Sequence, residues 1–299
     1  MPSSDPRLGN WLRDAPLTDH TLVALVGFPS DEGVRRNGGR PGAAAGPTAI
    51  RDVLWRMTPD ARDPAPFVAL LDRAADLGDV DVTGDLEADQ ARLGAVVGRL
   101  LARGVVPVVL GGGHETAYGH FLGWVETGRP VHALNWDAHA DVRPLVDGRG
   151  HSGSPFRQML DHPSGLCTGV TVAGLHPWRV AADHARVPTA VVWAEDLTAS
   201  RAEALVGALD GPTLASFDLD AVDAAPGVSA PGVGGISAAV WLRAAAACGR
   251  SPDVRSVDVV ELSPAHDIGG RTAALAALTV WHVLRGLAAR EAGAGPGVP

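Results

Sequence analysis

Residues 131–141 read VHALNWDAHAD, and this stretch decides both the fold and the chemistry expected of the chain. Its first six residues are mostly apolar and have the length of a buried strand, and the polar residues follow directly. Because side chains at i, i+2 and i+4 of an extended chain share one face, Asp137, His139 and Asp141 are predicted to point toward one centre.

Other apolar runs of strand length alternate along the chain with longer stretches of helical period. This alternation is typical of an α/β fold, and it predicts three layers, αβα, built on a mostly parallel central sheet. Residues 85–103 and 272–290 carry apolar side chains along one helical face and are expected to cover the sheet. The predicted strands are residues 21–28, 105–110, 131–136, 170–175, 189–193, 213–219 and 255–262.

The length of 299 residues and the hydrophobic content of 46% are enough to bury one large core. We expect a single domain over residues 1–299, with a short N-terminal extension and a flexible C-terminal tail over about 292–299. Three loops rich in Gly and Pro stand out because loops that leave the carboxyl ends of parallel strands form the ligand crevice of such folds. These loops are residues 35–47, 144–155 and 224–235.

The composition excludes several classes of function. All 25 Lys+Arg residues are arginine, so chemistries that need a lysine amine, such as Schiff-base catalysis and the P-loop, are absent. A net charge of -9 argues against a nucleic-acid or anionic-membrane partner and favours a small-molecule ligand. The two cysteines cannot build a disulfide framework, and the N-terminus lacks the layout of a signal peptide. We also expect no apolar run long enough to span a membrane. We therefore expect a cytoplasmic location.

Two further motifs supply ligand-type side chains at predicted strand ends. Residues 214–223 read LASFDLDAVD, which places Asp218 and Asp220 on one face of an extended chain. Residues 108–115 read VVLGGGHE, in which an apolar strand ends in glycines and then presents His114 at the start of a helix. Each motif alone is common in loops and turns that bind no metal, but the three together predict a metal site.

Four carboxylates and two imidazoles at one sheet edge carry too much negative charge to pack without cations. Two divalent metals resolve this conflict, and mostly oxygen donors with one imidazole per ion favour Mn²⁺, with Fe²⁺, Co²⁺ or Zn²⁺ as substitutes. A pair of ions about 3.5–4 Å apart can lower the pKa of a shared water toward neutrality, so hydrolysis is the expected reaction class.

At these residues the chain resembles the arginase/agmatinase (ureohydrolase) family over about residues 24–285. The resemblance implies an arginase-like fold, a homo-oligomer and two Mn²⁺ ions per subunit. It implies that one ion is held by His114, Asp137, Asp141 and Asp218. The other would be held by Asp137, His139, Asp218 and Asp220, with Asp137 and Asp218 bridging the two ions.

The resemblance also implies catalytic roles. Asp141 would accept a proton from the bridging water and pass it to the leaving nitrogen, and Glu261 would pair with the amidinium group of the substrate. Arginases and agmatinases carry a histidine where this chain has Ser152, with His151 one position earlier. His151 is therefore expected near the site, either in a catalytic role or as a loop residue.

Within the family the chain is most similar to the formimidoylglutamases, on residues 31–40 (DEGVRRNGGR), 113–115 (GHE), 142–143 (VR) and 151–158 (HSGSPFRQ). This likeness implies hydrolysis of N-formimino-L-glutamate to L-glutamate and formamide, a step of histidine degradation. Arginines would bind the two substrate carboxylates through bidentate hydrogen bonds. The candidates for substrate binding are Arg143 first, Ser152 beside it, and more weakly Arg157, Arg36 and Arg149, for which a solvated loop position is the alternative.

Other functions stay open at this point. The main alternative is an amidinohydrolase that releases urea from a guanidino acid or an agmatine-like substrate. A metal-retaining binding protein without turnover is an outside option, and a two-metal phosphatase is disfavoured because no phosphate-cradling loop is evident.

Overall fold

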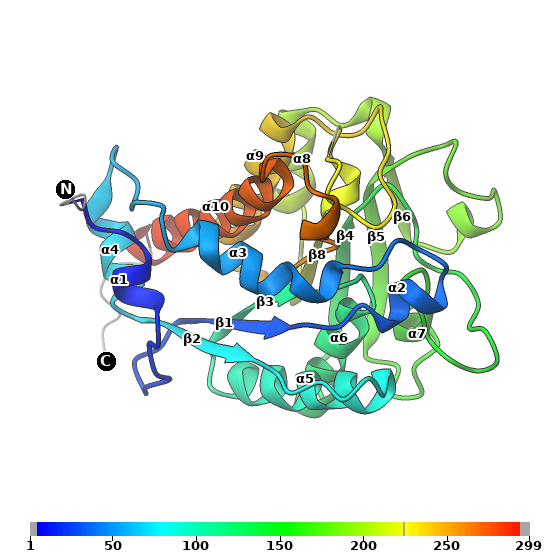
Figure 1. Ribbon diagram of the computed structural model, residues 1–299, viewed down its shortest axis with the longest axis horizontal. Helices are drawn as coiled ribbons and strands as arrows, with labels where there is room; N and C mark the ends of the chain where they lie inside the picture. The colour runs from blue at the N-terminus through cyan, green and yellow to red at the C-terminus, as the bar shows by residue number, and fades with distance from the viewer. Residues whose placement is uncertain (1–4, 224, 294–299) are drawn as a thin grey trace.

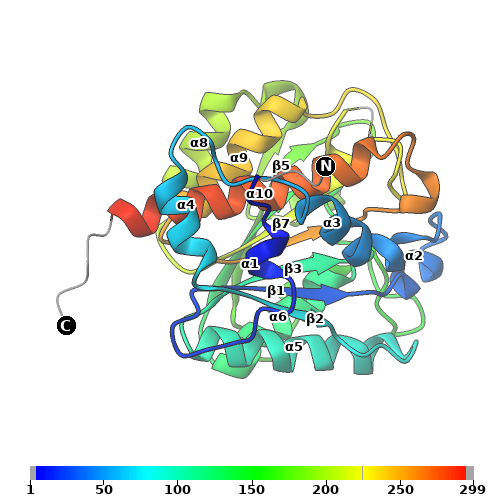
Figure 2. The ribbon, with the colours of Figure 1, turned by 60° about the vertical axis from the view of Figure 1, so that its left-hand side comes forward.

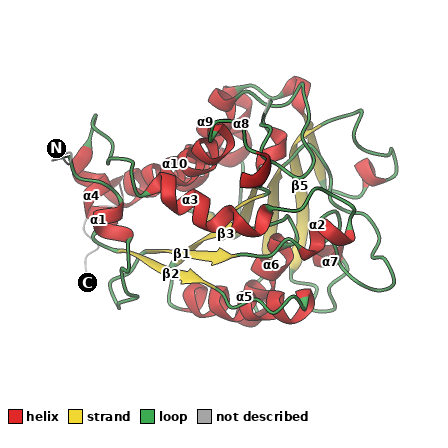
Figure 3. Ribbon diagram, viewed as in Figure 1, coloured by secondary structure: helices red, strands yellow, loops and turns green. Residues whose placement is uncertain are grey.

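The protein is built on one eight-stranded sheet in which every pair of neighbours is parallel, with strand order β2-β1-β3-β8-β7-β4-β5-β6 (Figures 1 and 3). The computed structural model describes residues 5–223 and 225–293. The prediction of an α/β fold on a mostly parallel sheet is confirmed. The strands are β1 (Val23–Phe28), β2 (Ala74–Asp79), β3 (Val106–Gly111), β4 (Val131–Trp136), β5 (Cys167–Leu175), β6 (Ala190–Trp193), β7 (Thr213–Asp218) and β8 (Val254–Val260).

Helices cover both faces of the sheet and complete the three predicted layers (Figure 2). Three helices begin with a side-chain cap, α5, α8 and α9; in α5, Asp85 accepts a hydrogen bond from the amide of Ala88. The helices are α1 (Gly9–Leu12), α2 (Glu32–Arg36), α3 (Gly46–Leu54), α4 (Pro64–Leu71), α5 (Leu86–Ala102), α6 (Thr116–Thr127), α7 (Pro155–Leu160), α8 (Ala199–Gly207), α9 (Ala238–Arg250) and α10 (Arg271–Gly293).

The sheet divides the core into two apolar clusters. Val108 faces the cluster that contains residues of α3, α4, α8, α9 and α10, whereas its neighbour Val109 faces the cluster with residues of α5, α6 and α7. In β4, Leu134 and Ala133 divide in the same way. Successive strand residues point to opposite faces, and in the central strands both faces are buried, so apolar residues predominate in them.

All seven predicted strands are present, and one strand was missed. β2 lies at the edge of the sheet and contains only Ala74, Ala75 and Leu77 as apolar residues. Its second half is exposed, so it needs little apolar surface and gives no hydrophobic run to detect.

The C-terminal helix α10 corrects one expectation. By length and composition α10 could cross a membrane, so the expectation that no apolar segment reaches spanning length was wrong. However, 61% of its most apolar 18-residue window is buried inside the fold, as in a core helix. The helix ends at Gly293, and residues 294–299 of the predicted tail lie outside the described residues, so the tail stays a prediction.

Close packing of α9 on α10 generates the first prediction. A Cβ atom at Gly286 would lie 2.3 Å from the carbonyl oxygen of Ala246, so Gly286→Ala must push the two backbones apart. We expect the free energy of unfolding to fall by about 1–3 kcal/mol, the usual cost of overpacking. Denaturant unfolding followed by circular dichroism measures the change.

Gly207→Ala in α8 is the matched control, because a Cβ atom there meets nothing within 4 Å. We expect the control to change the free energy of unfolding by less than about 1 kcal/mol. Equal effects of the two substitutions would contradict the close approach of the helices.

Candidate metal centre

The candidate metal centre lies at the carboxyl ends of the four adjacent central strands, β3, β8, β7 and β4. His114 follows β3, Asp218 ends β7 and Asp137 follows β4. Glu261 directly follows β8, between these strands. Because parallel strands end at the same edge of the sheet, side chains from distant motifs meet there.

Turns, rather than extended chain, bring the ligand-type residues of each motif together. β4 ends at Trp136, and the amide of His139 donates to Asp137 Oδ1 at 2.7 Å. Asp141 has a φ of 49°, in the left-handed region. After β7, the 3₁₀ turn η4 (Leu219–Ala221) lets the amide of Asp220 donate to Asp218 Oδ1 at 2.8 Å. The expectation that the residues converge on one face of an extended strand was therefore wrong, although they do converge.

One group of ligand atoms surrounds the ring of His114. Its Nδ1 atom lies 3.3 Å from Asp137 Oδ2, 2.9 Å from Asp141 Oδ2 and 3.0 Å from Asp218 Oδ2. Neighbouring ligand atoms of an octahedral cation with bonds of about 2.1 Å are about 3.0 Å apart. The spacing of these four atoms thus fits a single small divalent cation.

A second group contains Asp137, His139 and Asp220. His139 Nδ1 lies 3.1 Å from Asp220 Oδ2 and 3.4 Å from Asp137 Oδ1. Asp137 therefore contributes one oxygen to each group, as expected of a bridging carboxylate. Asp218 lies in the first group only, so its predicted bridging role stays a prediction.

A buried hydrogen-bonded chain fixes which nitrogen of His114 faces the carboxylates. The Ser216 hydroxyl donates to Asp258 Oδ1, so it accepts from His114 Nε2–H at 3.0 Å. The other oxygen of Asp258 accepts from His120 Nδ1 at 2.7 Å. This arrangement leaves His114 Nδ1 directed at the carboxylates, and among the described residues Nδ1 has no hydrogen-bond partner. A cation is the partner that suits such an atom.

Electrostatics also favours a cation at this centre. Burial raises the pKa of the Asp218 carboxyl well above its usual range, and the charges of Asp220 and Asp137 raise it further. Burial and the charge of Asp137 likewise raise the pKa of Asp141. For His114 burial acts to lower the pKa, but the surrounding carboxylates outweigh it and raise the pKa well above the usual value. The protein groups thus hold protons that a cation would replace.

Glu261 is held in a fixed orientation beside the ligands. Its φ of 73° is unusual for a residue other than glycine. The amide of His114 donates to Oε1 at 2.7 Å, and the Ser229 hydroxyl donates to Oε2. Burial raises the pKa of Glu261 to about 7, with the Ser229 hydrogen bond lowering it and the Asp220 charge raising it. A cationic group bound next to Glu261 would favour its charged form.

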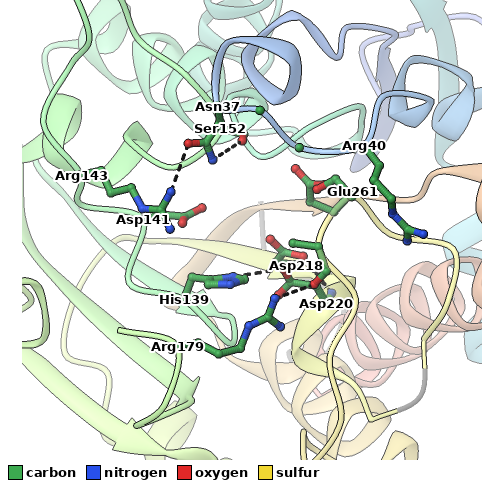
Figure 4. Close-up of a pocket in the computed structure, with 14 residues that line it drawn as sticks. Asn37, Arg40, His139, Asp141, Arg143, Ser152, Arg179, Asp218, Asp220 and Glu261 are labelled. Atoms are coloured by element: carbon green, nitrogen blue, oxygen red, sulfur yellow. Dashed lines mark hydrogen bonds and ion pairs between the residues drawn. The ribbon is translucent and has the colours of Figure 1, made fainter. Parts of the chain in front are cut away.

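A cavity of about 420 Å³ opens over the ligands, and it contains two of the predicted substrate-binding residues (Figure 4). Arg143 Nη1 donates to Asn37 Oδ1 at 3.2 Å, and Asn37 Nδ2 donates to Ser152 Oγ at 3.1 Å. Arg143 and Ser152 thus line the same wall of the cavity, joined through Asn37.

The structure does not place His151 or the remaining arginine candidates in the wall of this cavity. His151 is buried in its own loop, where Nε2–H donates to the Pro144 carbonyl and Nδ1 accepts from the amide of Gly153, both at 3.1 Å. Both ring nitrogens are therefore engaged, which corrects the catalytic interpretation of His151 in favour of the loop alternative.

The weaker arginine candidates also have partners outside the cavity. Arg157 Nε donates to the carbonyl of Val142, and its Nη1 lies 3.8 Å from Asp161. Arg36 pairs with Glu32 and Glu87, and its Nη1 donates to a backbone carbonyl. Arg149 lies 4.0 Å from Glu87. These arginines connect surface loops, and none lines the cavity over the ligands.

Several residues that line the cavity were not among the predicted ones: Asn37, Arg40, Arg179 and Ser229. Three of these lie in the glycine- and proline-rich loops 35–47 and 224–235, so the loop composition was the available signal. Arg179 lies after β5 in residues 176–179 (HPWR), where no motif marks it.

Known proteins with similar sequences and structures agree with this geometry. The sequence model of the arginase family matches residues 21–285. A formimidoylglutamase of Geobacillus thermodenitrificans is 39% identical over 277 residues, covering 88% of this chain and 84% of the relative. The crystal structure of Trypanosoma cruzi formiminoglutamase with Mn²⁺ has a TM-score of 0.87 at 31% identity and covers 96% of this chain and 100% of that one.

The structural likeness also extends to an enzyme of another name. The proclavaminate amidino hydrolase of Streptomyces clavuligerus has a TM-score of 0.80 at 28% identity, covering 93% of this chain and 95% of that one. The chain belongs to the arginase family, as its metal motifs predicted. The solved structures in these comparisons share the fold of this chain.

The protonated ligand cluster generates the second prediction. Mn²⁺ must displace protons whose pKa values are raised, so its affinity is expected to increase as the pH rises. Calorimetric titration in two buffers with different ionisation heats measures both the affinity and the number of protons released. Affinity that does not change with pH would contradict the arrangement of the cluster.

Asp218→Asn tests the same centre without a pH change. The variant is expected to bind at most half of the Mn²⁺ that the parent protein binds, measured by elemental analysis after gel filtration. Asp210→Asn, on an exposed residue before β7, removes one charge elsewhere and should keep the full Mn²⁺ content.

Proposed function

We propose that the protein is a manganese-dependent hydrolase of N-formimino-L-glutamate. Water adds to the formimino carbon and the bond from that carbon to the α-nitrogen breaks, giving L-glutamate and formamide. The observation that carries this proposal is the cavity itself, in which Glu261, Arg143 and Arg179 share the walls with two groups of metal ligands. The names of the similar proteins support the choice of substrate.

The two ligand groups would hold the ions, and bound Mn²⁺ lowers the pKa of water and polarises the group under attack. The side chains then have separate tasks. Asp141 accepts the proton of the attacking water and transfers it to the departing glutamate nitrogen. Its carboxylate suits this exchange because burial and the charge of Asp137 raise its pKa, which makes the carboxylate a better proton acceptor than an ordinary aspartate.

Glu261 binds the cationic amidine end of the substrate. Its oxygens are oriented by the His114 amide and the Ser229 hydroxyl, and each oxygen keeps a further lone pair for the substrate. A carboxylate held in this way contacts both nitrogens of an amidine through charge-assisted hydrogen bonds.

Positive charge on the remaining walls suits a substrate with two carboxylates. Arg143 and Arg179 line the cavity, and within the described residues neither pairs with an acidic side chain within 4.0 Å. Agmatine has no carboxylate, so these arginines argue against it. A guanidino acid is the second candidate, since it would satisfy Glu261 and one arginine, and the structural likeness to an amidino hydrolase supports it.

We also propose a homo-oligomer and a cytoplasmic location. The first rests on the family resemblance, and the second rests on the composition of the chain. A binding protein without turnover would not need Glu261 aimed at a ligand beside a complete set of metal ligands.

The third prediction tests the reaction directly. Protein loaded with Mn²⁺ should convert N-formimino-L-glutamate to equal amounts of glutamate and formamide without releasing ammonia, measured by separate assays of the three products. Turnover of a guanidino acid with release of urea, and not of the formimino acid, would replace this function with the second candidate.

Glu261→Gln should lower kcat/KM by about 30-fold or more, because the loss of a close charged pair in a buried site costs about 2 kcal/mol or more. Glu195→Gln changes an exposed carboxylate outside the cavity and should leave kcat/KM unchanged. A full loss of activity with retained Mn²⁺ content would assign Glu261 to the reacting group, whereas unchanged activity would remove it from the site.

A further inference from the structure

A second cavity of about 200 Å³ adjoins the one over the metal ligands. Its walls come from the residues after β4 and from the segment after β5 that ends in η2 (His184–Arg186). Four residues line both cavities: His139, Asp141, Arg143 and Arg179. Arg143 and Arg179 therefore stand at the junction of the two spaces, on loops from two neighbouring strands.

Arg179 is held in place by backbone and not by an acidic side chain. Its Nη2 donates to the Ala230 carbonyl at 2.8 Å, and Nη1 is buried without a hydrogen-bond partner among the described residues. A Cβ atom at Gly232 would lie 2.5 Å from Nη1, so the glycine leaves the space that the guanidinium occupies. The guanidinium is thus oriented by a neutral group, and in the part of the chain that the structure describes no acidic side chain lies within 4.0 Å of it.

Arg40 shows what a more fully bonded arginine looks like in the same cavity. Its Nη2 donates to the carbonyls of both Pro226 and Val228, at 3.0 and 2.5 Å. In Figure 4, Arg40 lies on the side of Glu261, whereas Arg179 and Arg143 lie on the opposite side of the cavity. Arg179 is therefore the less satisfied of these two cations, and it lies across the cavity from Arg40.

The covalent structure of the substrate requires a separate cation for its second carboxylate. The α-carboxylate is attached to the carbon that bears the reacting nitrogen, so it stays near the metal ligands. The side-chain carboxylate is three carbon–carbon bonds from that same carbon, so it must lie away from Glu261 and the amidine. The junction of the two cavities offers a guanidinium there.

We propose that Arg179 binds the side-chain carboxylate of the substrate and thereby selects glutamate derivatives over uncharged analogues. The inference rests on the proposed function for the identity of the substrate. It assigns to Arg179 a role in specificity, separate from the chemistry at the metal ligands and Glu261.

Arg179→Met tests the role, with N-formimino-L-glutamate and its carboxamide analogue N-formimino-L-glutamine as the pair of substrates. The variant should lose about 30- to 300-fold in kcat/KM for the glutamate derivative, the usual effect of removing one partner of a close charged pair. For the carboxamide analogue the change should stay within about 3-fold, because a neutral amide does not need the charge. Arg179→Lys should restore part of the selectivity, since it keeps the charge but not the planar fork.

Arg186→Met is the matched control. Arg186 is exposed in the same segment after β5, lies outside both cavities and carries the same charge. It should leave both kcat/KM values unchanged. Equal losses on both substrates in Arg179→Met, or the same loss of selectivity in Arg186→Met, would overturn the proposal and make Arg179 a structural residue or a source of general charge.

Gly232→Ala provides a second variant that keeps the arginine. The added methyl group would displace Nη1, so selectivity between the two substrates should fall several-fold while the melting temperature and Mn²⁺ content stay unchanged. Unchanged selectivity would count against a guanidinium fixed by this loop.

Binding of L-glutamate separates this inference from the proposed function. If the parent protein does not hydrolyse the formimino substrate, the proposed function fails, and calorimetric titration with L-glutamate and L-glutamine then decides the role of Arg179. Weaker binding of L-glutamate in Arg179→Met, but not in Arg186→Met, would support a carboxylate site. Equal binding in all three proteins would overturn it.

Discussion

Repulsion among buried carboxylates at the carboxyl edge of the sheet is the constraint on which the site depends. Asp137, Asp218 and Asp220 are almost fully buried, and the first group places three carboxylates around one histidine nitrogen. Side chains in this arrangement stay together only as a partly protonated cluster or around cations. The parallel arrangement of β3, β8, β7 and β4 brings these carboxylates together, because all four strands end at the same edge of the sheet.

Residues within the same strands also hold one of the ligand side chains in place through hydrogen bonds. Ser216 lies on β7 and Asp258 lies on β8. Their hydrogen bonds connect His114 at the site with His120 in helix α6. Since Asp258 receives two hydrogen bonds, it holds both partners in one orientation, and the ring of His114 keeps the tautomer that a cation needs. The fold and the chemistry are thus coupled through strand residues that never reach the cavity.

Sequence patterns predicted the central strands and the ligand-type residues because both have local signatures. Long apolar runs mark strands buried on both faces, and Asp137, His139 and Asp218 follow such runs directly. The edge strand β2 has no such run, and the turns that gather the ligands depend on φ at Asp141 and on the 3₁₀ turn at Leu219, which periodicity does not encode. The family resemblance placed His151 near the site, but the partners of its ring nitrogens are set by the fold of its own loop.

The arginines show why residue type alone could not locate the substrate-binding groups. In a chain without lysine, every structural cation is an arginine, so the presence of one in a loop carries little information. Arg143 and Arg179 differ in their partners from the predicted candidates outside the cavity, Arg36, Arg149 and Arg157, each of which lies within 4.0 Å of an acidic side chain. Arg36 and Arg51 each pair with two acidic side chains and thereby connect elements of the fold. Arg179 is held instead by one carbonyl, and its charge stays available at the junction of two cavities. An arginine anchored by a neutral group costs the fold an unneutralised charge, and an anionic ligand is the partner that would balance it.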